Sequence, residues 1–227
     1  MRIRHIKGSE DYIAASPFVI DDPGAYRGCW KREVFGNENP LYLEVGMGMG
    51  QFIRTHAMLH PAISYIGFEI NTTVLYKSLR RYEALLPERE MSTEPKDCNL
   101  RFIRQDARLL AEDFAQGEVN QIYLNFSDPW PKDKNANKRL TSPVFLALYD
   151  KILAPGGVIE FKTDNEGLFD YSLESIPQSG WELLDVTRDL HADPVRSEGN
   201  VMTEYEAKFS GKGNPIYKLI AGRKGEQ

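Results

Sequence analysis

Short apolar runs alternate with amphipathic stretches along most of the chain. Seven runs have the apolar content expected of strands, and the segments between them repeat apolar residues at helical spacing. The predicted strands span residues 41–45, 63–70, 99–104, 121–126, 158–162, 181–187 and 216–221. The predicted helices span residues 51–60, 72–87, 109–114, 143–153 and 166–175. This alternation predicts an α/β fold with a doubly wound, Rossmann-like, mostly parallel seven-stranded sheet.

The first forty residues show no such period. Prolines and glycines recur among scattered aromatic and charged residues, which is typical of irregular structure. We therefore expect residues 1–40 to form an irregular N-terminal arm and residues 41–227 to form the main domain.

Composition narrows the classes of protein. A hydrophobic content of 41% supports a real core and excludes a disordered chain. The two cysteines, Cys29 and Cys98, form no CxxC pair, which argues against a zinc ribbon or disulfide framework and fits a reducing cytoplasm. No apolar run is long enough to span a membrane. Together with the cysteine pattern, this predicts a cytoplasmic protein that has no membrane segment and binds no metal. A net charge of −5 argues against a general nucleic-acid binder but leaves room for a local basic patch.

A glycine-rich turn follows the first predicted strand, at Glu44-Val45-Gly46-Met47-Gly48-Met49-Gly50. The dinucleotide fingerprint GxGxxG would require a glycine at position 51, where this chain has Gln51. A pyrophosphate beside Glu44 would meet a like charge, whereas the ammonium and sulfonium of S-adenosylmethionine would meet an opposite one. A tight turn with a solvated Glu44 remains the alternative.

Two further acidic residues end predicted strands. Glu69 lies about 20 residues beyond the glycines, where a carboxylate can accept hydrogen bonds from ribose hydroxyls. Asp106 follows the third strand and can reach an adenine amino group, cap the next helix, or do both. Together the three strand ends favour S-adenosylmethionine as cofactor.

The fourth predicted strand leads into Asp128-Pro129-Trp130-Pro131-Lys132. Each proline fixes its own φ and restricts the residue before it, so Asp128 and Trp130 lie in a stiff segment. Methyl transfer depends on such positioning. A rigid surface turn with Trp130 covering the core explains the pattern equally well.

Five motifs together resemble the bacterial tRNA (guanine-N7)-methyltransferase family. They extend in family order over most of the chain, from Glu44 to Phe209. The matching segments are Leu43–Gly50, Gly67–Glu69, Asp128–Lys132, Lys162–Asp164 and Thr203–Phe209. The resemblance implies transfer of a methyl group from S-adenosylmethionine to N7 of a variable-loop guanosine, position 46 of tRNA. It also implies a monomer or homodimer with no obligatory partner subunit, and assigns residues 41–227 as the methyltransferase domain.

The resemblance also implies roles for individual residues. Asp128 would be the catalytic residue, nearest the reacting atoms, and would also contact the cofactor. The cofactor-binding residues would be Glu44, Gly46, Gly48, Glu69, Asp106 and Asp128. The substrate-binding residues would be Lys132, Asp164, Thr203, Glu204, Tyr205 and Glu206.

Guanine N7 carries an in-plane lone pair and no proton, so it can attack a methyl group without a general base. We expect Asp128 to stabilise the developing positive charge and Asp164 or Glu206 to orient the base. RNA contact requires basic groups. The candidates are Arg2, Arg4, Lys7, Arg101, Arg104, Arg108 and the loop from Lys134 to Arg139. The family usually has a dense basic run after DPWPK, but residues 128–139 hold four basic and two acidic groups here.

Two other functions fit parts of the pattern. One is an S-adenosylmethionine enzyme that methylates an exocyclic amine, because the DPW segment partly resembles the DPP[YF] loop of amino-methyltransferases. The other is a non-catalytic nucleotide- or RNA-binding module of the same fold. The methylated product would distinguish all three.

Overall fold

A computed structural model describes residues 4–225, and its contacts divide the chain into two compact units, Met1–Ala115 and Gln116–Gln227. Seven strands occur in the described residues, and they give an α/β fold with a mostly parallel sheet. The predicted fold class is therefore confirmed. The division predicted from the sequence, an arm over residues 1–40 and a domain over 41–227, stays a prediction.

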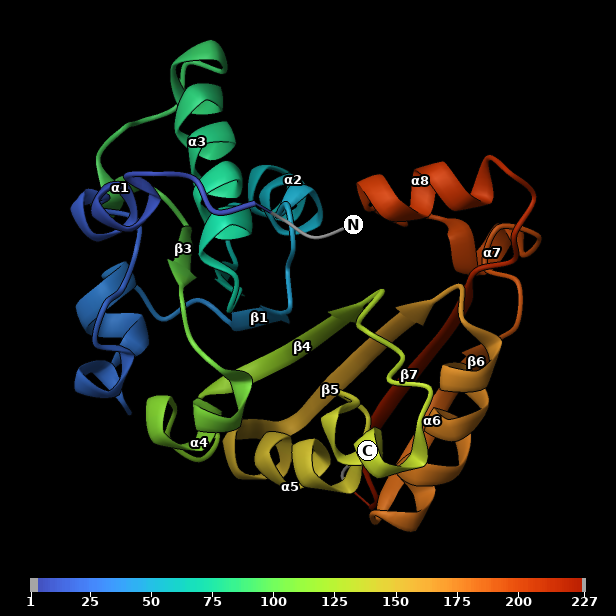
Figure 1. Ribbon diagram of the computed structural model, residues 1–227. Coiled ribbons are helices and arrows are strands. Elements are labelled where there is room, and N and C mark those ends of the chain that lie inside the picture. The colour runs from blue at the N-terminus through green and yellow to red at the C-terminus, as the bar shows by residue number, and fades with distance from the viewer. Residues whose placement is uncertain (1–3, 226–227) are drawn as a thin grey trace. The chain divides into compact units, whose positions relative to one another are not determined.

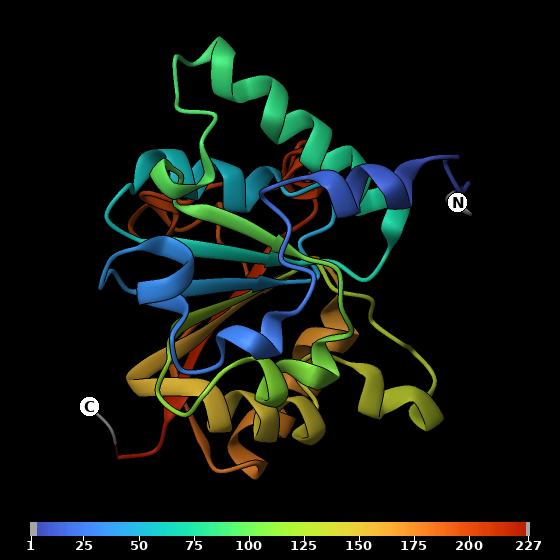
Figure 2. The ribbon, with the colours of Figure 1, turned by 90° about the vertical axis from the view of Figure 1, so that its left-hand side faces the viewer.

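In the first unit, three parallel strands lie in the order β3-β2-β1. Helices α2 and α3 lie on one face of these strands (Figure 2). Every residue of β2 and β3 is buried, which explains their near-continuous apolar sequences. The elements are α1 (Ser9–Ala15), η1 (Pro23–Tyr26), η2 (Trp30–Phe35), β1 (Leu41–Val45), α2 (Gln51–Leu59), β2 (Ser64–Phe68), α3 (Thr72–Glu88), η3 (Pro95–Asp97), β3 (Leu100–Ile103), η4 (Ala107–Leu109) and α4 (Leu110–Asp113).

The N-terminal residues are more regular than expected. Residues 4–40 form three short helices, and the indole of Trp30 is fully buried against Phe114. The backbone of Phe18 and Ile20 hydrogen-bonds to Phe102 of β3 and extends the ladder by one bridge. On α1, Tyr12 donates a hydrogen bond to Glu83 of α3. These contacts fix helices that are too short to show a period in the sequence.

In the second unit, the strand order is β4-β5-β7-β6, and only β7 runs against its neighbours. Helices α5 and α6 lie on one face of these strands (Figure 1). The elements are β4 (Val119–Asn125), η5 (Asp133–Lys138), α5 (Pro143–Ile152), β5 (Leu153–Thr163), α6 (Glu166–Gln178), β6 (Trp181–Thr187), α7 (Pro194–Ser197), α8 (Glu204–Ser210) and β7 (Tyr217–Arg223).

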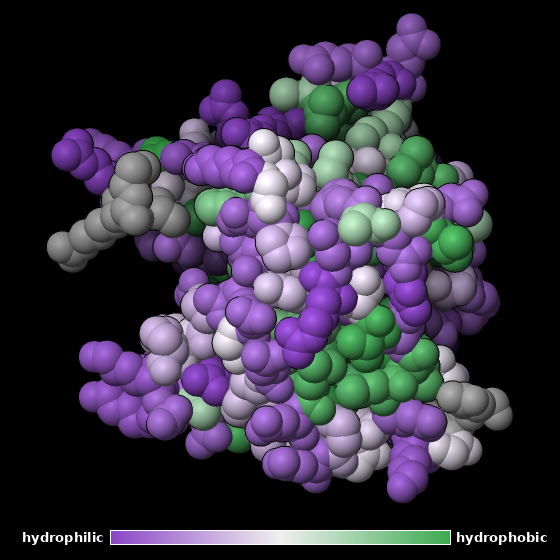
Figure 3. All heavy atoms as spheres, turned by 90° about the vertical axis from the view of Figure 1, so that its right-hand side faces the viewer, coloured by the Kyte–Doolittle hydropathy of each residue, from purple (hydrophilic) through white to green (hydrophobic). Residues whose placement is uncertain are grey.

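The surface beside β6 is mainly hydrophilic around one compact apolar patch (Figure 3). Leu184 on β6 is among the exposed large apolar side chains of the described residues. No helix among residues 4–225 is both long and apolar enough to cross a membrane.

Candidate functional site

The glycine-rich turn between β1 and α2 has a backbone that requires glycine. Gly46, Gly48 and Gly50 have φ values of 73°, 56° and 67°, in the left-handed region that disfavours a side chain. A Cβ at Gly50 would lie 2.3 Å from the hydroxyl of Ser78, while the space beside Gly48 is open to 4 Å. The turn therefore presents bare backbone next to free space at Gly48.

Arg54 holds this turn in place, a role that the sequence analysis missed. The side chain is buried, and its Nη1 donates to the carbonyl of Met49 at 2.5 Å and to the hydroxyl of Ser78 at 3.2 Å. An arginine in the middle of a predicted helix gives no local signal of this contact, because Ser78 is 24 positions away.

Two buried carboxylates lie at the carboxyl ends of β1 and β2. Glu44 is 1% exposed and Glu69 is 9% exposed. The two oxygens of Glu69 accept hydrogen bonds from the backbone of Gly48 at 3.0 Å and of Asn71 at 2.7 Å. Carboxylate oxygens are acceptors for hydroxyl donors such as those of a ribose. Acidic oxygens beside an open, glycine-lined turn fit a ligand with a ribose and a positive charge.

After β3, Asp106 caps helix η4. Its carboxylate accepts from the backbone of Arg108 at 2.9 Å and pairs with the Arg108 guanidinium at 3.1 Å. Asp106 therefore caps the helix, which is one of the two roles considered from the sequence. The contact of Asp106 with the cofactor stays a prediction. The neighbouring amide of Gln105 donates to both oxygens of Asp113 at 3.0 Å. Burial raises the pKa of Asp113 to about 6.

In the second unit, Asp128 is exposed in the loop that follows β4. Positive φ values flank it, 50° at Phe126 and 43° at Trp130. Non-glycine residues rarely adopt this conformation, and such strain collects at functional loops. The loop is therefore shaped by its surroundings and not by local preference alone.

The residues predicted to contact substrate lie at several positions in the second unit. Lys132 and Glu204 are exposed, and Thr203 caps α8 by accepting from the backbone of Glu206 at 2.9 Å. Tyr205 is 44% exposed and donates to Asp164 at 3.5 Å. Partial burial and the Asp164 carboxylate raise the pKa of Tyr205, so its phenol stays a donor. Their contact brings together two of the predicted residues that are 41 positions apart.

Glu206 differs from the other predicted substrate ligands. Its side chain is fully buried, and one oxygen pairs with Lys162 of β5 at 2.7 Å. The other oxygen accepts from Asn200 at 2.7 Å and lies 3.1 Å from Nε2 of His191. Lys162 is also fully buried and donates to Asn200 and to the carbonyl of Val201. The carboxylate thus has protein partners on both oxygens and anchors α8 to β5.

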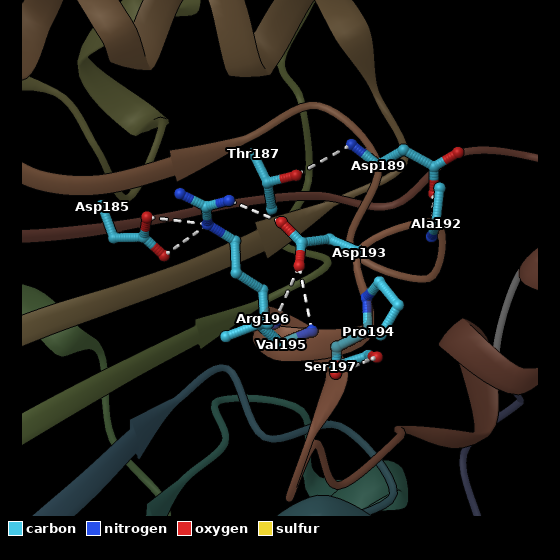
Figure 4. A network of polar contacts seen from close by, with 9 residues as sticks. All are labelled: Asp185, Thr187, Asp189, Ala192, Asp193, Pro194, Val195, Arg196 and Ser197. Carbon is cyan, nitrogen blue, oxygen red and sulfur yellow. Dashed lines mark hydrogen bonds and ion pairs between the residues drawn. The ribbon is translucent and has the colours of Figure 1, made fainter.

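A second network holds the segment between β6 and α8 (Figure 4). Arg196 pairs with Asp185 of β6 at 2.8 Å and with Asp193 at 2.5 Å. Asp193 also caps α7 by accepting from the backbone of Val195 and Arg196. Charge pairing and capping therefore order a helix of only four residues.

The basic residues predicted to contact RNA fall into two groups. Arg101 and Arg139 are buried, and the guanidinium of Arg101 donates to the carbonyls of Val34, Pro95, Cys98 and Leu100. The prediction that these two side chains contact RNA is therefore wrong, because both are buried. Arg2 lies outside the described residues. The exposed candidates are Arg4, Lys7, Arg104, Arg108, Lys134 and Lys138. Within residues 4–225, no group of three or more His, Cys, Asp or Glu side chains could hold a metal ion.

Comparison with known proteins identifies the family of the chain. A family model described as "Putative methyltransferase" matches residues 38–219. A tRNA (guanine-N(7)-)-methyltransferase of Lachnoclostridium phytofermentans is 50% identical over 226 residues, covering 100% of both chains. One of the same name from Lactococcus lactis subsp. cremoris is 47% identical over 223 residues, covering 97% of both chains.

Among solved structures, one described as an antibiotic-related methyltransferase has a TM-score of 0.62 at 14% identity, and the match covers 84% of this chain and 91% of that one. At this identity, the likeness shows the fold alone. The two relatives match over nearly the full length of both chains at 47–50% identity, which shows the family: the chain belongs to the tRNA (guanine-N(7)-)-methyltransferase family.

Proposed function

We propose that this protein is an S-adenosylmethionine-dependent methyltransferase that modifies N7 of guanosine in tRNA. The observation that carries the proposal is the 50% identity, over the full length of both chains, to a relative that bears this name. The motifs read from the sequence support the same activity. We further propose that the target is the guanosine at position 46 in the variable loop and that the enzyme acts in the cytoplasm, as a monomer or homodimer.

The first unit supplies the groups that would hold the cofactor. The backbone at Gly46 and Gly48 would let the ligand approach closely, because no side chain intervenes. Glu69 would accept the ribose hydroxyls, and Glu44 would face the positively charged methionine end. Asp106 would contact the adenine amino group through the capacity left beside its capping bond. S-adenosylmethionine supplies an electrophilic methyl group on a sulfonium when it is bound.

The second unit supplies the groups proposed for the chemical step. Guanine N7 needs no base, because its lone pair is free at neutral pH. Asp128 would stabilise the positive charge that develops as the methyl group moves from sulfur to N7. Asp164 would accept hydrogen bonds from the amino and ring N–H groups of guanine, and Tyr205 would stack on the base. Lys132, Thr203 and Glu204 would contact the nucleotide around it.

Glu206 requires a different role in this scheme. Since its carboxylate is buried against Lys162, Asn200 and His191, it would act on the substrate indirectly. We propose that it positions Thr203 and Tyr205 at the start of α8, and that Asp164 alone orients the guanine.

The test is transfer of a labelled methyl group to tRNA that lacks this modification, followed by nucleoside mapping. We expect N7-methylguanosine at position 46 and its loss with the Asp128→Asn variant. Label on an exocyclic amine would favour an amino-methyltransferase, and no transfer at all would favour a binding module. Label at another guanosine N7 would retain the activity and overturn the proposed position.

A further inference from the structure

Arg139 is the last residue of the predicted basic loop, but its side chain turns inward. It is 9% exposed and follows η5 directly. Its Nε lies 3.1 Å from the carbonyl oxygen of Pro129, and its Nη2 lies 3.0 Å from that of Trp130. The guanidinium carbon sits 4.2 Å from the centre of the Tyr171 ring on α6. The positive charge is therefore directed at the loop and not at solvent.

The two carbonyls that Arg139 binds belong to the strained part of the loop. Trp130 has a φ of 43° and precedes Pro131, a combination that the residue before a proline rarely adopts. Such a conformation is unfavourable and persists only where surrounding contacts hold it. Arg139 provides such contacts to the backbone, and the ammonium of Lys138 lies 4.6 Å from the centre of the Trp130 ring.

We propose that Arg139 is a positioning residue that fixes the backbone of residues 129–130 and thereby the carboxylate of Asp128. This inference rests on the proposed role of Asp128 in methyl transfer. Pro129 directly follows Asp128, so a rotation of the 129–130 backbone moves the carboxylate. Transition-state stabilisation by a fixed charge depends on that charge being placed before the reaction.

The chemistry of the contact requires arginine in particular. A planar guanidinium can donate in a fork to two adjacent carbonyls while its face stacks on an aromatic ring. A lysine ammonium is a point charge that can satisfy one carbonyl and does not stack in this way. Arg139→Lys is therefore expected to preserve the charge and lose most of the positioning.

The test compares Arg139→Ala and Arg139→Lys with Lys134→Ala, which removes an exposed charge from the same loop. For Arg139→Ala we expect kcat at saturating tRNA to fall about 10- to 100-fold. This is a smaller fall than the removal of one electrostatic stabiliser causes, because Asp128 itself remains. The KM for tRNA should change less than about threefold, and the salt dependence of binding should match wild type. Lys134→Ala should instead raise KM and weaken the salt dependence.

Guanidinium ion added at millimolar concentration provides the second measurement. It should restore part of the kcat of Arg139→Ala by occupying the vacated position between the carbonyls and Tyr171, and it should not assist Lys134→Ala. A variant that merely unfolded would show neither this rescue nor the unchanged KM. Wild-type kcat for Arg139→Ala, or a defect confined to KM and salt dependence, would overturn the proposal.

Hydrogen exchange of the segment 126–140 separates this inference from the proposed function. Arg139→Ala should speed exchange in this segment, and guanidinium should slow it again, whatever reaction the enzyme catalyses. Faster exchange without any methyl transfer by wild type would refute the proposed function and leave the loop contact intact. Unchanged exchange would refute the positioning role.

Discussion

The contribution of the buried ion pair between Lys162 and Glu206 to the free energy of unfolding can be tested directly. Both side chains are fully inaccessible, and the Lys162 ammonium donates to Glu206 at 2.7 Å, Val201 at 3.0 Å and Asn200 at 3.1 Å. Lys162→Met keeps most of the volume and removes the charge. It leaves the Glu206 carboxylate buried without its cation, and two further acceptors without this donor.

Breaking a buried pair from one side costs about 3–5 kcal/mol. With a urea m-value of about 2 kcal/mol/M, a loss of about 4 kcal/mol lowers the unfolding midpoint by roughly 2 M. This is a large share of the total of about 5–15 kcal/mol that stabilises a typical domain. Equilibrium urea unfolding of the full chain, followed by circular dichroism, measures the shift.

Lys218→Met is the matched control. Lys218 lies directly opposite Lys162 in the β5–β7 register, and it pairs with Glu160 at 3.2 Å. Both partners of that pair retain 14% exposure, so water can replace the lost contact, and we expect a loss of about 1 kcal/mol. The double variant Lys162→Met with Glu206→Gln should recover part of the loss, because no uncompensated carboxylate remains. Equal midpoints for Lys162→Met and Lys218→Met, with additive effects in the double variant, would refute this account.

Three further outcomes follow from the site. Asp128→Ala should lower kcat about 100-fold or more, as loss of one electrostatic stabiliser does, and unchanged turnover would remove Asp128 from the mechanism. The kcat should show no rising limb near pH 7, because N7 needs no base; a limb near neutrality would point to a general base, and His191 would be examined first. Burial raises the pKa of Asp113 from 3.8 to about 6, so its stabilising contribution is full below pH 3.8 and is lost as the pH rises through 6. Asp113→Asn, which does not titrate, should therefore gain up to about 3 kcal/mol relative to wild type between pH 4 and pH 7, and parallel unfolding curves across that range would contradict the shift.

The elements with a strong period could be predicted from the sequence. Strand β6 has the predicted limits, residues 181–187, and α3 begins at the predicted residue 72, where the side chain of Asn71 caps it by accepting from Val74. Strand β5 is longer than the predicted strand 158–162: it begins at Leu153 and continues through the segment Pro155-Gly156-Gly157. Boundaries at such irregular positions depend on pairing with β4, which no local pattern reports.

Apart from α4, which lies within the predicted helix 109–114, the short helices could not be predicted, because contacts between distant residues stabilise them. Helix α8 has seven residues, and its Glu206 reaches Lys162, 44 positions earlier. In the sequence analysis, the resemblance to the methyltransferase family implies that Thr203 and Glu206 contact the substrate. The structure assigns the Thr203 hydroxyl to capping and the Glu206 carboxylate to the interior.

Buried cations explain why charge counts overstate the basic surface of this protein. In an irregular loop, backbone carbonyls have no neighbouring strand to pair with, and a buried donor with several N–H groups can satisfy them together. Arg54, Arg101, Arg139 and Lys162 all donate to such carbonyls. These four belong to the 28 Lys and Arg of the chain, but they are buried and do not add to its basic surface. Of the basic residues in 132–139, only Lys132, Lys134 and Lys138 are exposed, and the exposed carboxylate of Asp133 offsets part of their charge. Since each phosphate contact contributes about 0.7–0.9 to the logarithmic salt slope of binding, this loop accounts for a slope of no more than about 3.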